Sequence, residues 1–274
     1  MSQSYSDSGL TAKRSYRRFI AGLAALAVCA LAHAWNYDSQ ATTTEQVMQF
    51  RVGADFTKKW HNGLRLSLAE DVRIDAYNSL NGAAFSKAYT TLTLGYTPID
   101  YFKVDAGYTL RVMGRKDWSD ANEVLRHRVF MSVAGVYPSQ YVKFSLRERV
   151  LCDMRTDSVN LLEKNQYNWL LRSRLSAEFI IPGQPVKPYV WCELENTLNV
   201  PQYQQKNGRQ YISHVRTQVG CKWRVTQMSS LDFYYRFQYG YNRDINITKT
   251  KGYIQLTEQT TYLHAIGVIY HLDW

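Results

Sequence analysis

Apolar and polar residues alternate along most of the chain after residue 45. In residues 231–242, six consecutive odd-numbered positions are aromatic or aliphatic, while the even-numbered positions are mostly polar or small. Successive side chains of a β-strand point to opposite faces, so this period of two predicts strands with one apolar and one polar face. The same alternation recurs, in places with interruptions, in residues 47–57, 64–76, 86–96, 102–112, 124–137, 140–151, 167–179, 188–198, 215–225 and 262–274.

The length of these segments favours a membrane protein. Strands of globular proteins average about 5–6 residues, whereas a tilted transmembrane strand needs about 9–11. A barrel would place the apolar faces against lipid and the polar faces around the lumen, and its closure would satisfy every backbone hydrogen bond. We therefore predict an all-β fold, a transmembrane up-and-down antiparallel β-barrel.

The connections between the predicted strands alternate in length. Short turns are expected at 97–100, 137–140, 182–185 and 226–229, and long loops at 114–122, 154–165, 199–209 and 243–259. Single-chain bacterial barrels have even strand numbers, but only eleven segments carry the pattern. We therefore expect about twelve strands, with a weakly patterned one near Trp35–Thr42, and ten strands as the fallback.

The N-terminus has the three parts of an export signal. A basic stretch (Lys13, Arg14, Arg17, Arg18) precedes the apolar run Phe19–Leu31, and Ala32-His33-Ala34 offers a cleavage site before Trp35. The apolar run is shorter than the roughly 20 residues of a transmembrane helix. We predict a cleaved signal peptide at 1–34, a barrel domain at 35–274 and a location in the bacterial outer membrane. A retained anchor and a lipoprotein modified at Cys29 are the alternatives.

The C-terminus ends on an alternating strand with an aromatic last residue. Tyr270, Leu272 and Trp274 share one face, an arrangement similar to the sorting signal that the outer-membrane assembly machinery reads. The partners expected are this machinery, membrane lipids and lipopolysaccharide, with small anions added if the lumen is open. Loss of residues 1–34 removes four of 33 basic and one of 23 acidic residues, leaving 29 against 22. This mild excess, together with export, argues against nucleic acid as a partner.

The predicted lumen face is rich in charge. The basic residues assigned to it are Arg51, Arg65, Arg73, Lys103, Arg111, Arg126, Arg128, Lys143, Arg147, Arg149, Arg172, Arg174, Arg216, Lys222, Arg224 and Arg236. The acidic residues are Asp55, Asp71, Asp75, Asp105, Glu178, Glu193, Glu195 and Asp232. Two interpretations follow: a structural barrel whose ion pairs fill the lumen, or a narrow anion-preferring channel lined by surplus arginines. Both are non-enzymatic.

Some residues do not fit this simple picture. Glu148, and similarly Glu70, falls on the predicted lipid face, so we expect a bulge near Arg147 or a position close to the membrane interface for Glu148. The alternation of its strand predicts that Trp191 points into the lumen, where its ring would suit a sugar-stacking platform.

Catalytic and metal motifs are missing from the sequence. No G-x-S-x-G or H-E-x-x-H occurs, and we expect no cofactor or metal. A lipid-acting hydrolase or acyltransferase would need His127 or His264 near a serine such as Ser132 or Ser173. This enzyme and an exported carbohydrate-binding β-sandwich are the alternative functions. Cys152, Cys192 and Cys221 are an odd number and are expected to be apolar fillers.

Two arginine-rich segments and the paired layout of turns resemble a known family. The segments are Leu125-Arg126-His127-Arg128 and Leu146-Arg147-Glu148-Arg149. The chain is similar over roughly residues 45–274 to the domain of unknown function 2490 family, outer-membrane barrels common in Bacteroidota. The resemblance implies a barrel and its location, and no activity or functional residues.

Overall fold

A computed structural model of the chain describes residues 43–79, 84–114, 125–155, 165–200, 212–248 and 253–274. The predicted signal peptide and the predicted strand at 35–42 lie outside these residues. No helix in the described segments is long and apolar enough to cross a membrane.

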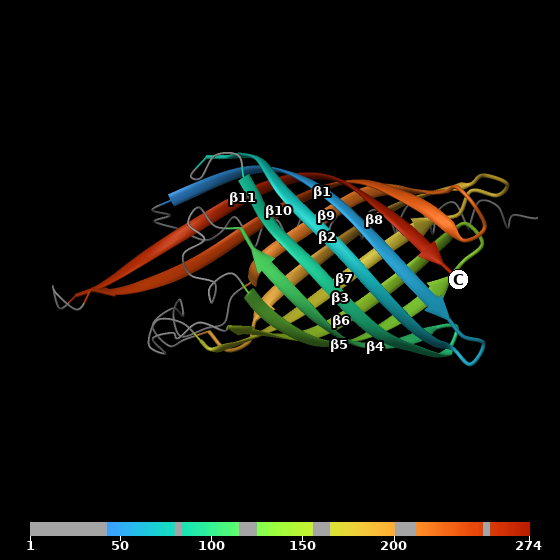
Figure 1. Cartoon of the computed structure of the whole chain (residues 1–274), viewed down its shortest axis with the longest axis horizontal. Helices are drawn as coiled ribbons and strands as arrows, with labels where there is room; N and C mark the ends of the chain where they lie inside the picture. Colours follow the sequence, from blue (N-terminus) through green and yellow to red (C-terminus); the bar gives the residue numbers. More distant parts are fainter. Residues whose placement is uncertain (1–42, 80–83, 115–124, 156–164, 201–211, 249–252) are drawn as a thin grey trace, which may run out of the picture. The chain divides into compact units, whose positions relative to one another are not determined.

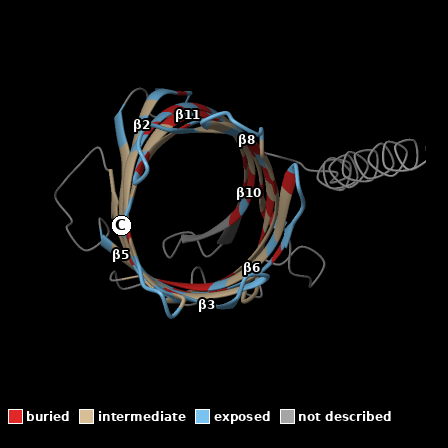
Figure 2. Cartoon of the chain, turned by 90° about the vertical axis from the view of Figure 1, so that its right-hand side faces the viewer, coloured by how far each residue is buried: buried red, intermediate tan, exposed pale blue. Residues whose placement is uncertain are grey.

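The described residues form one closed sheet, which Figure 2 shows end-on as a ring. Its strands follow one another around the barrel in chain order (Figure 1). They are β1 (Thr43–Lys59), β2 (Leu64–Asn78), β3 (Ala84–Ile99), β4 (Phe102–Met113), β5 (Leu125–Pro138), β6 (Val142–Arg155), β7 (Tyr167–Phe179), β8 (Val186–Thr197), β9 (Ile212–Arg224), β10 (Ser229–Thr248) and β11 (Tyr253–Asp273). The all-β up-and-down barrel is thus confirmed, and the single closed sheet contradicts the β-sandwich alternative.

The barrel closes with eleven strands, so the expected counts of twelve and ten are wrong for the described residues. Strand β1 pairs directly with β11 in parallel, from Thr43 opposite Gln259 to Thr57 opposite Asp273. A twelfth strand would have to lie between these two, and their pairing leaves no room for it. An odd count makes the first and last strands run the same way, which explains the parallel seam.

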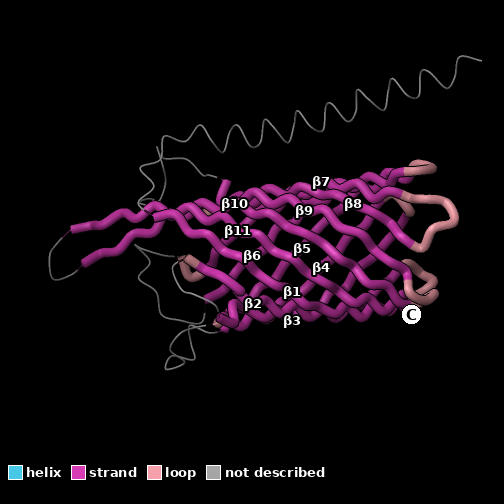
Figure 3. Tube along the Cα trace, turned by 90° about the horizontal axis from the view of Figure 1, so that it is seen from above, coloured by secondary structure: helices cyan, strands magenta, loops and turns pink. Residues whose placement is uncertain are grey.

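The two ends of the barrel differ, as predicted. Short connections such as 139–141 and 225–228 lie at the end that carries the C-terminus (Figure 1). One expected long loop, 243–259, is wrong, because β10 and β11 continue through it and pair from Ser229 opposite Leu272 to Thr248 opposite Tyr253. Figure 3 shows this two-stranded ribbon extending beyond the other strands.

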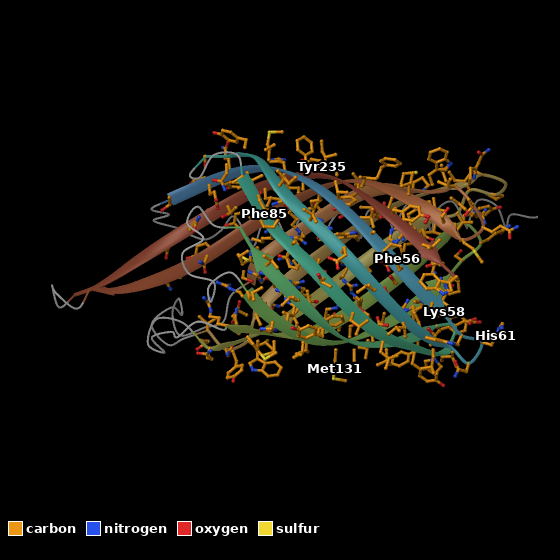
Figure 4. The ribbon with its side chains drawn as sticks, in the orientation of Figure 1. Phe56, Lys58, His61, Phe85, Met131 and Tyr235 are labelled. Atoms are coloured by element: carbon orange, nitrogen blue, oxygen red, sulfur yellow. The ribbon has the colours of Figure 1, made fainter. Side chains whose placement is uncertain are left out.

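Large apolar side chains cover the outer surface of the barrel. Met48, Phe50 and Val52 of β1 are each more than half exposed, while the intervening Gln49 and Arg51 are buried in the lumen. On β5, Met131 is 65% exposed and points away from the barrel (Figure 4), whereas its neighbour Ser132 is buried. This is the reverse of a water-soluble protein, where apolar side chains gather inside.

Two outward carboxylates have hydroxyl partners on the neighbouring strand. Ser173 donates a hydrogen bond to Glu148 Oε2 at 2.6 Å, and Thr90 donates to Glu70 Oε2 at 2.9 Å. The expected bulge near Arg147 is wrong, because β6 keeps its register with both neighbours there. The Ser173 hydroxyl on the neighbouring strand therefore satisfies part of the hydrogen-bonding capacity of the Glu148 carboxylate, and the backbone of β6 keeps its regular pairing.

Glycines on the lumen face make room for inward aromatic rings. Tyr189 lies directly opposite Gly220, and Phe130 lies opposite Gly107. A Cβ on Gly220 would fall 2.5 Å from the Tyr189 hydroxyl oxygen, and one on Gly107 would fall 2.4 Å from the Phe130 ring. The rings thus lie flat across the glycines and fill the lumen close to the wall.

The turn between β1 and β2 gives a test of local backbone geometry. Gly63 has a φ of 83°, and a Cβ there would lie 2.5 Å from the Thr97 carbonyl oxygen, whereas Gly183 has a φ of 73° with nothing within 4 Å. The left-handed conformation costs a residue with a Cβ about 1–2 kcal/mol. We expect Gly63→Ala to lower the free energy of unfolding clearly more than Gly183→Ala does in urea titrations of the folded barrel. Equal losses would contradict the packing of Gly63 against Thr97.

Candidate functional site: a cationic lumen

The half of the lumen nearest the long connections encloses a cavity of about 680 Å³, here called the loop-end cavity. Among the residues that the structure describes, its lining contains twice as many basic as acidic side chains. The basic ones are Arg73, Lys87, Arg111, Arg126, Arg128, Arg155, Arg172, Arg174, Arg216 and Arg236, and the acidic ones are Glu45, Asp71, Asp153, Glu193 and Glu195. Burial in a narrow lumen weakens the screening of these charges by water, so their electrostatic interactions are stronger than on an exposed surface.

Glu193 on β8 is shared by three arginines, and its side chain is only 2% exposed. Its Oε2 lies 2.7 Å from Arg174 Nη2 and 3.3 Å from Arg147 Nη2, and its Oε1 accepts from Arg216 Nη1 at 3.0 Å. The register places Arg174 and Arg216 directly opposite Glu193 on the strands to either side. One carboxylate therefore joins guanidinium groups from β6, β7 and β9.

Glu195, two residues further along β8, forms a second such centre. It accepts hydrogen bonds from Arg172 Nε and from Arg216 Nη1, the latter at 3.0 Å, and its Oε1 lies 2.8 Å from His214 Nδ1. A register shift between β8 and β9 at Glu195 brings Ser213 into the lumen as well. Ser213 Oγ lies 3.2 Å from His214 Nδ1, the nitrogen that faces Glu195, so these residues lack the relay through two ring nitrogens of a catalytic triad.

Asp153 on β6 is the third shared carboxylate. It accepts from Arg128 through both Nε and Nη2, the latter at 2.8 Å, and from Arg111 Nη1 at 3.3 Å. Arg111 and Arg128 point inward from β4 and β5, where the alternation of each strand places them. The three shared carboxylates thus cross-link the wall from β4 to β9.

Stacked arginines and aromatic rings occupy the middle of the lumen. Trp191 is buried, with the Arg174 guanidinium 3.9 Å and the Arg236 guanidinium 5.1 Å from its ring centroid. Arg149 lies 4.3 Å above the Phe130 ring. Such contacts orient guanidinium groups, and here they narrow the lumen. Trp191 is inward as predicted, and two guanidinium groups lie over its ring.

A second cavity of about 530 Å³ lies at the end with the short turns and shares no lining residue with the first. Lys59, Arg65, Lys103 and Lys143 line it, against Asp100 as its one acidic residue among those described. Arg65 is paired with Asp105 at 2.5 Å. Both ends of the lumen are therefore basic, and the stacked arginines and aromatic rings lie between them.

The remaining predicted lumen residues are spread along the wall. Buried Arg51 donates to Gln49 at 2.6 Å, and Asp55 accepts from Ser67 at 2.7 Å. Other contacts of this group include those of Asp75 with Gln49, Glu178 with Lys187, Asp232 with Tyr189, and Lys222 with the Tyr189 ring. Arg224, at the turn end of β9, is exposed and lines neither cavity.

Several residues of the loop-end cavity were missed by sequence reasoning. Asp153 and Arg155 continue the alternation of β6 beyond residue 151, where the predicted strand ended, and Glu45 continues that of β1 in the same way. Extending each pattern by four residues would have found them. Lys87 and Tyr89 follow a register shift between β2 and β3, at which β3 contains one extra residue, Ser86.

The outward histidines pair with tyrosines on the neighbouring strands. His127 Nδ1 lies 2.5 Å from the Tyr108 hydroxyl, and His264 Nδ1 lies 2.7 Å from the Tyr235 hydroxyl. Ser132 is in the lumen with Asp105, and Ser173 faces outward to Glu148. Within the described part of the chain, neither serine contacts either histidine, and no group of residues is suited to hold a metal ion.

The fold and this lining define the class of the protein: a closed β-barrel with an apolar outer surface and a cationic lumen. Residues 47–248 match the family model described as protein of unknown function (DUF2490), so the chain belongs to that family and the resemblance is confirmed. No curated protein matches the chain. Among solved structures, that of the NanC porin is similar with 10% identity and a TM-score of 0.42, covering 70% of this chain and 85% of that one.

Proposed function

We propose that this protein is a non-enzymatic outer-membrane barrel with a narrow, anion-preferring lumen. The observation that carries the proposal is the loop-end cavity, where ten basic side chains face five acidic ones among the described residues. Even if each of these carboxylates neutralises one cation, the described lining keeps an excess of five positive charges. They attract anions and repel cations of similar size.

The membrane placement is supported by the outer surface. Exposed side chains such as Phe50, Leu94 and Met131 would be costly in water and favourable in lipid. The expected partners are then membrane lipids, lipopolysaccharide and the outer-membrane assembly machinery, which would read the strand that ends at Trp274. Tyr270 and Trp274 are exposed on that strand.

Fractionation of cells that express the full chain tests the membrane placement. We expect the mature protein in the outer-membrane pellet, with its N-terminus at Trp35, and faster gel migration before boiling than after. Recovery of the mature protein in the soluble periplasm would overturn this part of the proposal.

Solute flux into proteoliposomes tests the lumen. We expect a small organic anion to enter faster than a cation of equal size, and a charge reversal such as Arg236→Glu to reduce the difference. Absence of flux above that of empty liposomes would favour the alternative. This is a structural barrel whose ion pairs, stacked arginines and aromatic rings fill the lumen.

A further inference from the structure

The cavity at the end with the short turns, here called the turn-end cavity, has an apolar strip on one wall. Ala134, Val136 and Pro138 alternate along β5 on its lumen face, the face to which buried Ser132 belongs. Val136, only 8% exposed, and Pro138 line the cavity. The loop-end cavity is lined mainly by polar and charged side chains, so this strip gives the turn-end cavity a different character: it offers a surface for an apolar group.

A lysine lies on each side of the strip. Lys103 of β4 is directly opposite Ala134, and Lys143 of β6 is directly opposite Pro138. Both lysines line the cavity. Side chains directly opposite each other on neighbouring strands have Cβ atoms about 4.5–5.5 Å apart, so each lysine lies beside the apolar strip.

Two carboxylates near these lysines in the sheet pair with other residues. Asp105, two residues after Lys103, lies 2.5 Å from Arg65 Nη2. Glu178, directly opposite Lys143, lies 3.9 Å from the ammonium group of a lysine on β8. Within the described segments, neither Lys103 nor Lys143 has a carboxylate at ion-pair distance. Both ammonium groups can therefore donate to a bound anion.

The rim of the cavity is fixed by backbone hydrogen bonds between its turns. The Trp60 N–H donates to the Leu64 carbonyl at 2.9 Å, and the Thr97 N–H donates to the Gly63 carbonyl at 3.0 Å. All four residues line the cavity, and the Trp60 side chain is 45% exposed there. Asp100, the one acidic lining residue among those described, is exposed in the turn between β3 and β4, where water and salt screen its charge.

We propose that the turn-end cavity binds a small organic anion with an apolar body, such as an aromatic carboxylate. Its volume of about 530 Å³ falls in the range of ligand sites, about 300–1,000 Å³. The anionic group accepts hydrogen bonds from the Lys103 and Lys143 ammonium groups. The apolar body lies against Val136, Pro138 and Trp60. This proposal rests on the anion-preferring lumen proposed above and names the class of anion held at this mouth.

Titration calorimetry of the refolded mature barrel in detergent tests the site with three probes, each corrected for its heat in protein-free micelles. They are naphthoate, the uncharged naphthamide with the same rings, and acetate, which has the carboxylate alone. We expect naphthoate to bind about tenfold more tightly than either of the others at equal ionic strength, because only naphthoate uses both the ammonium groups and the apolar strip.

Lys103→Gln and Lys143→Gln should each weaken naphthoate binding by about tenfold, because each removes a hydrogen bond between charged groups. Trp60→Ala should weaken the binding of naphthoate more than that of acetate. Lys58→Gln is the matched control, since Lys58 lies at the same end of β1 and lines neither cavity, and binding should be unchanged. Heat-modifiable gel migration verifies that each variant is folded.

Equal binding of naphthoate and naphthamide, or equal effects of Lys103→Gln, Lys143→Gln and the control, would overturn the site. Proteoliposomes that still prefer anions would then leave the proposed function standing. Conversely, naphthoate binding that depends on both lysines, in a barrel without anion-selective flux, would support the site and overturn the proposed function alone.

Discussion

Glu193→Gln should destabilise the barrel more than any other single charge neutralisation in the lumen. The substitution keeps the shape of a side chain that is 2% exposed, but it removes the negative charge that joins Arg147, Arg174 and Arg216. Removal of one partner from a buried ionic cluster costs about 3–5 kcal/mol, because the remaining charges stay buried without compensation. Urea unfolding of the refolded protein in detergent, followed by tryptophan fluorescence, measures the loss.

Glu178→Gln is the matched control for this prediction. Glu178 lies at the turn end of β7, and its carboxylate is 3.9 Å from the half-exposed ammonium of Lys187. An exposed ion pair contributes about 0–1 kcal/mol, so the variant should unfold close to the wild type. If Glu193→Gln were equally mild, the cluster around Glu193 would not cross-link the wall in the way that its distances indicate.

Met131→Arg should weaken folding into lipid bilayers strongly. Met131 is 65% exposed at the middle of β5 and points outward. An arginine facing lipid near the bilayer midplane costs about 2–4 kcal/mol, and the cost falls to about 0–1 kcal/mol near the interfaces. Reversible folding into lipid vesicles at increasing urea concentrations measures the difference from the wild type.

Tyr137→Arg is the control for depth, since Tyr137 is 68% exposed on the same strand but near its turn end. We expect a clearly smaller loss there than at Met131. A neutral or favourable effect at both positions would mean that water, not lipid, surrounds the outer surface.

The alternation of residues predicted most of the fold because each strand has two different environments. The apolar residues of β1 and β2 alternate with polar ones for the length of the strands, and these segments were recognised without any knowledge of their neighbours. The strand count was not predictable in this way. It depends on the direct pairing of β1 with β11. This contact joins the first and the last strand and leaves no pattern in the sequence of either one.

Cross-strand partners were missed for the same reason. Glu148 alone indicates a bulge or an interface position, but Ser173, 25 residues away, supplies its hydrogen bond. The alternation of their strands similarly placed Glu193 and Arg174 on the lumen face. That the two side chains form an ion pair follows from the register between β7 and β8. The basic excess of the lumen was visible in the sequence, and the grouping of Lys103 and Lys143 around one cavity became visible only with the strands assembled.

The central claim is that the lumen prefers anions, and the zero-current potential across a planar bilayer tests it most directly. The purified mature protein would be inserted into a bilayer that separates two KCl solutions of different concentration. We predict discrete, small conductance steps and a reversal potential whose sign corresponds to chloride selectivity. A reversal potential of the opposite sign, or no conductance above that of the bare bilayer, would contradict the claim.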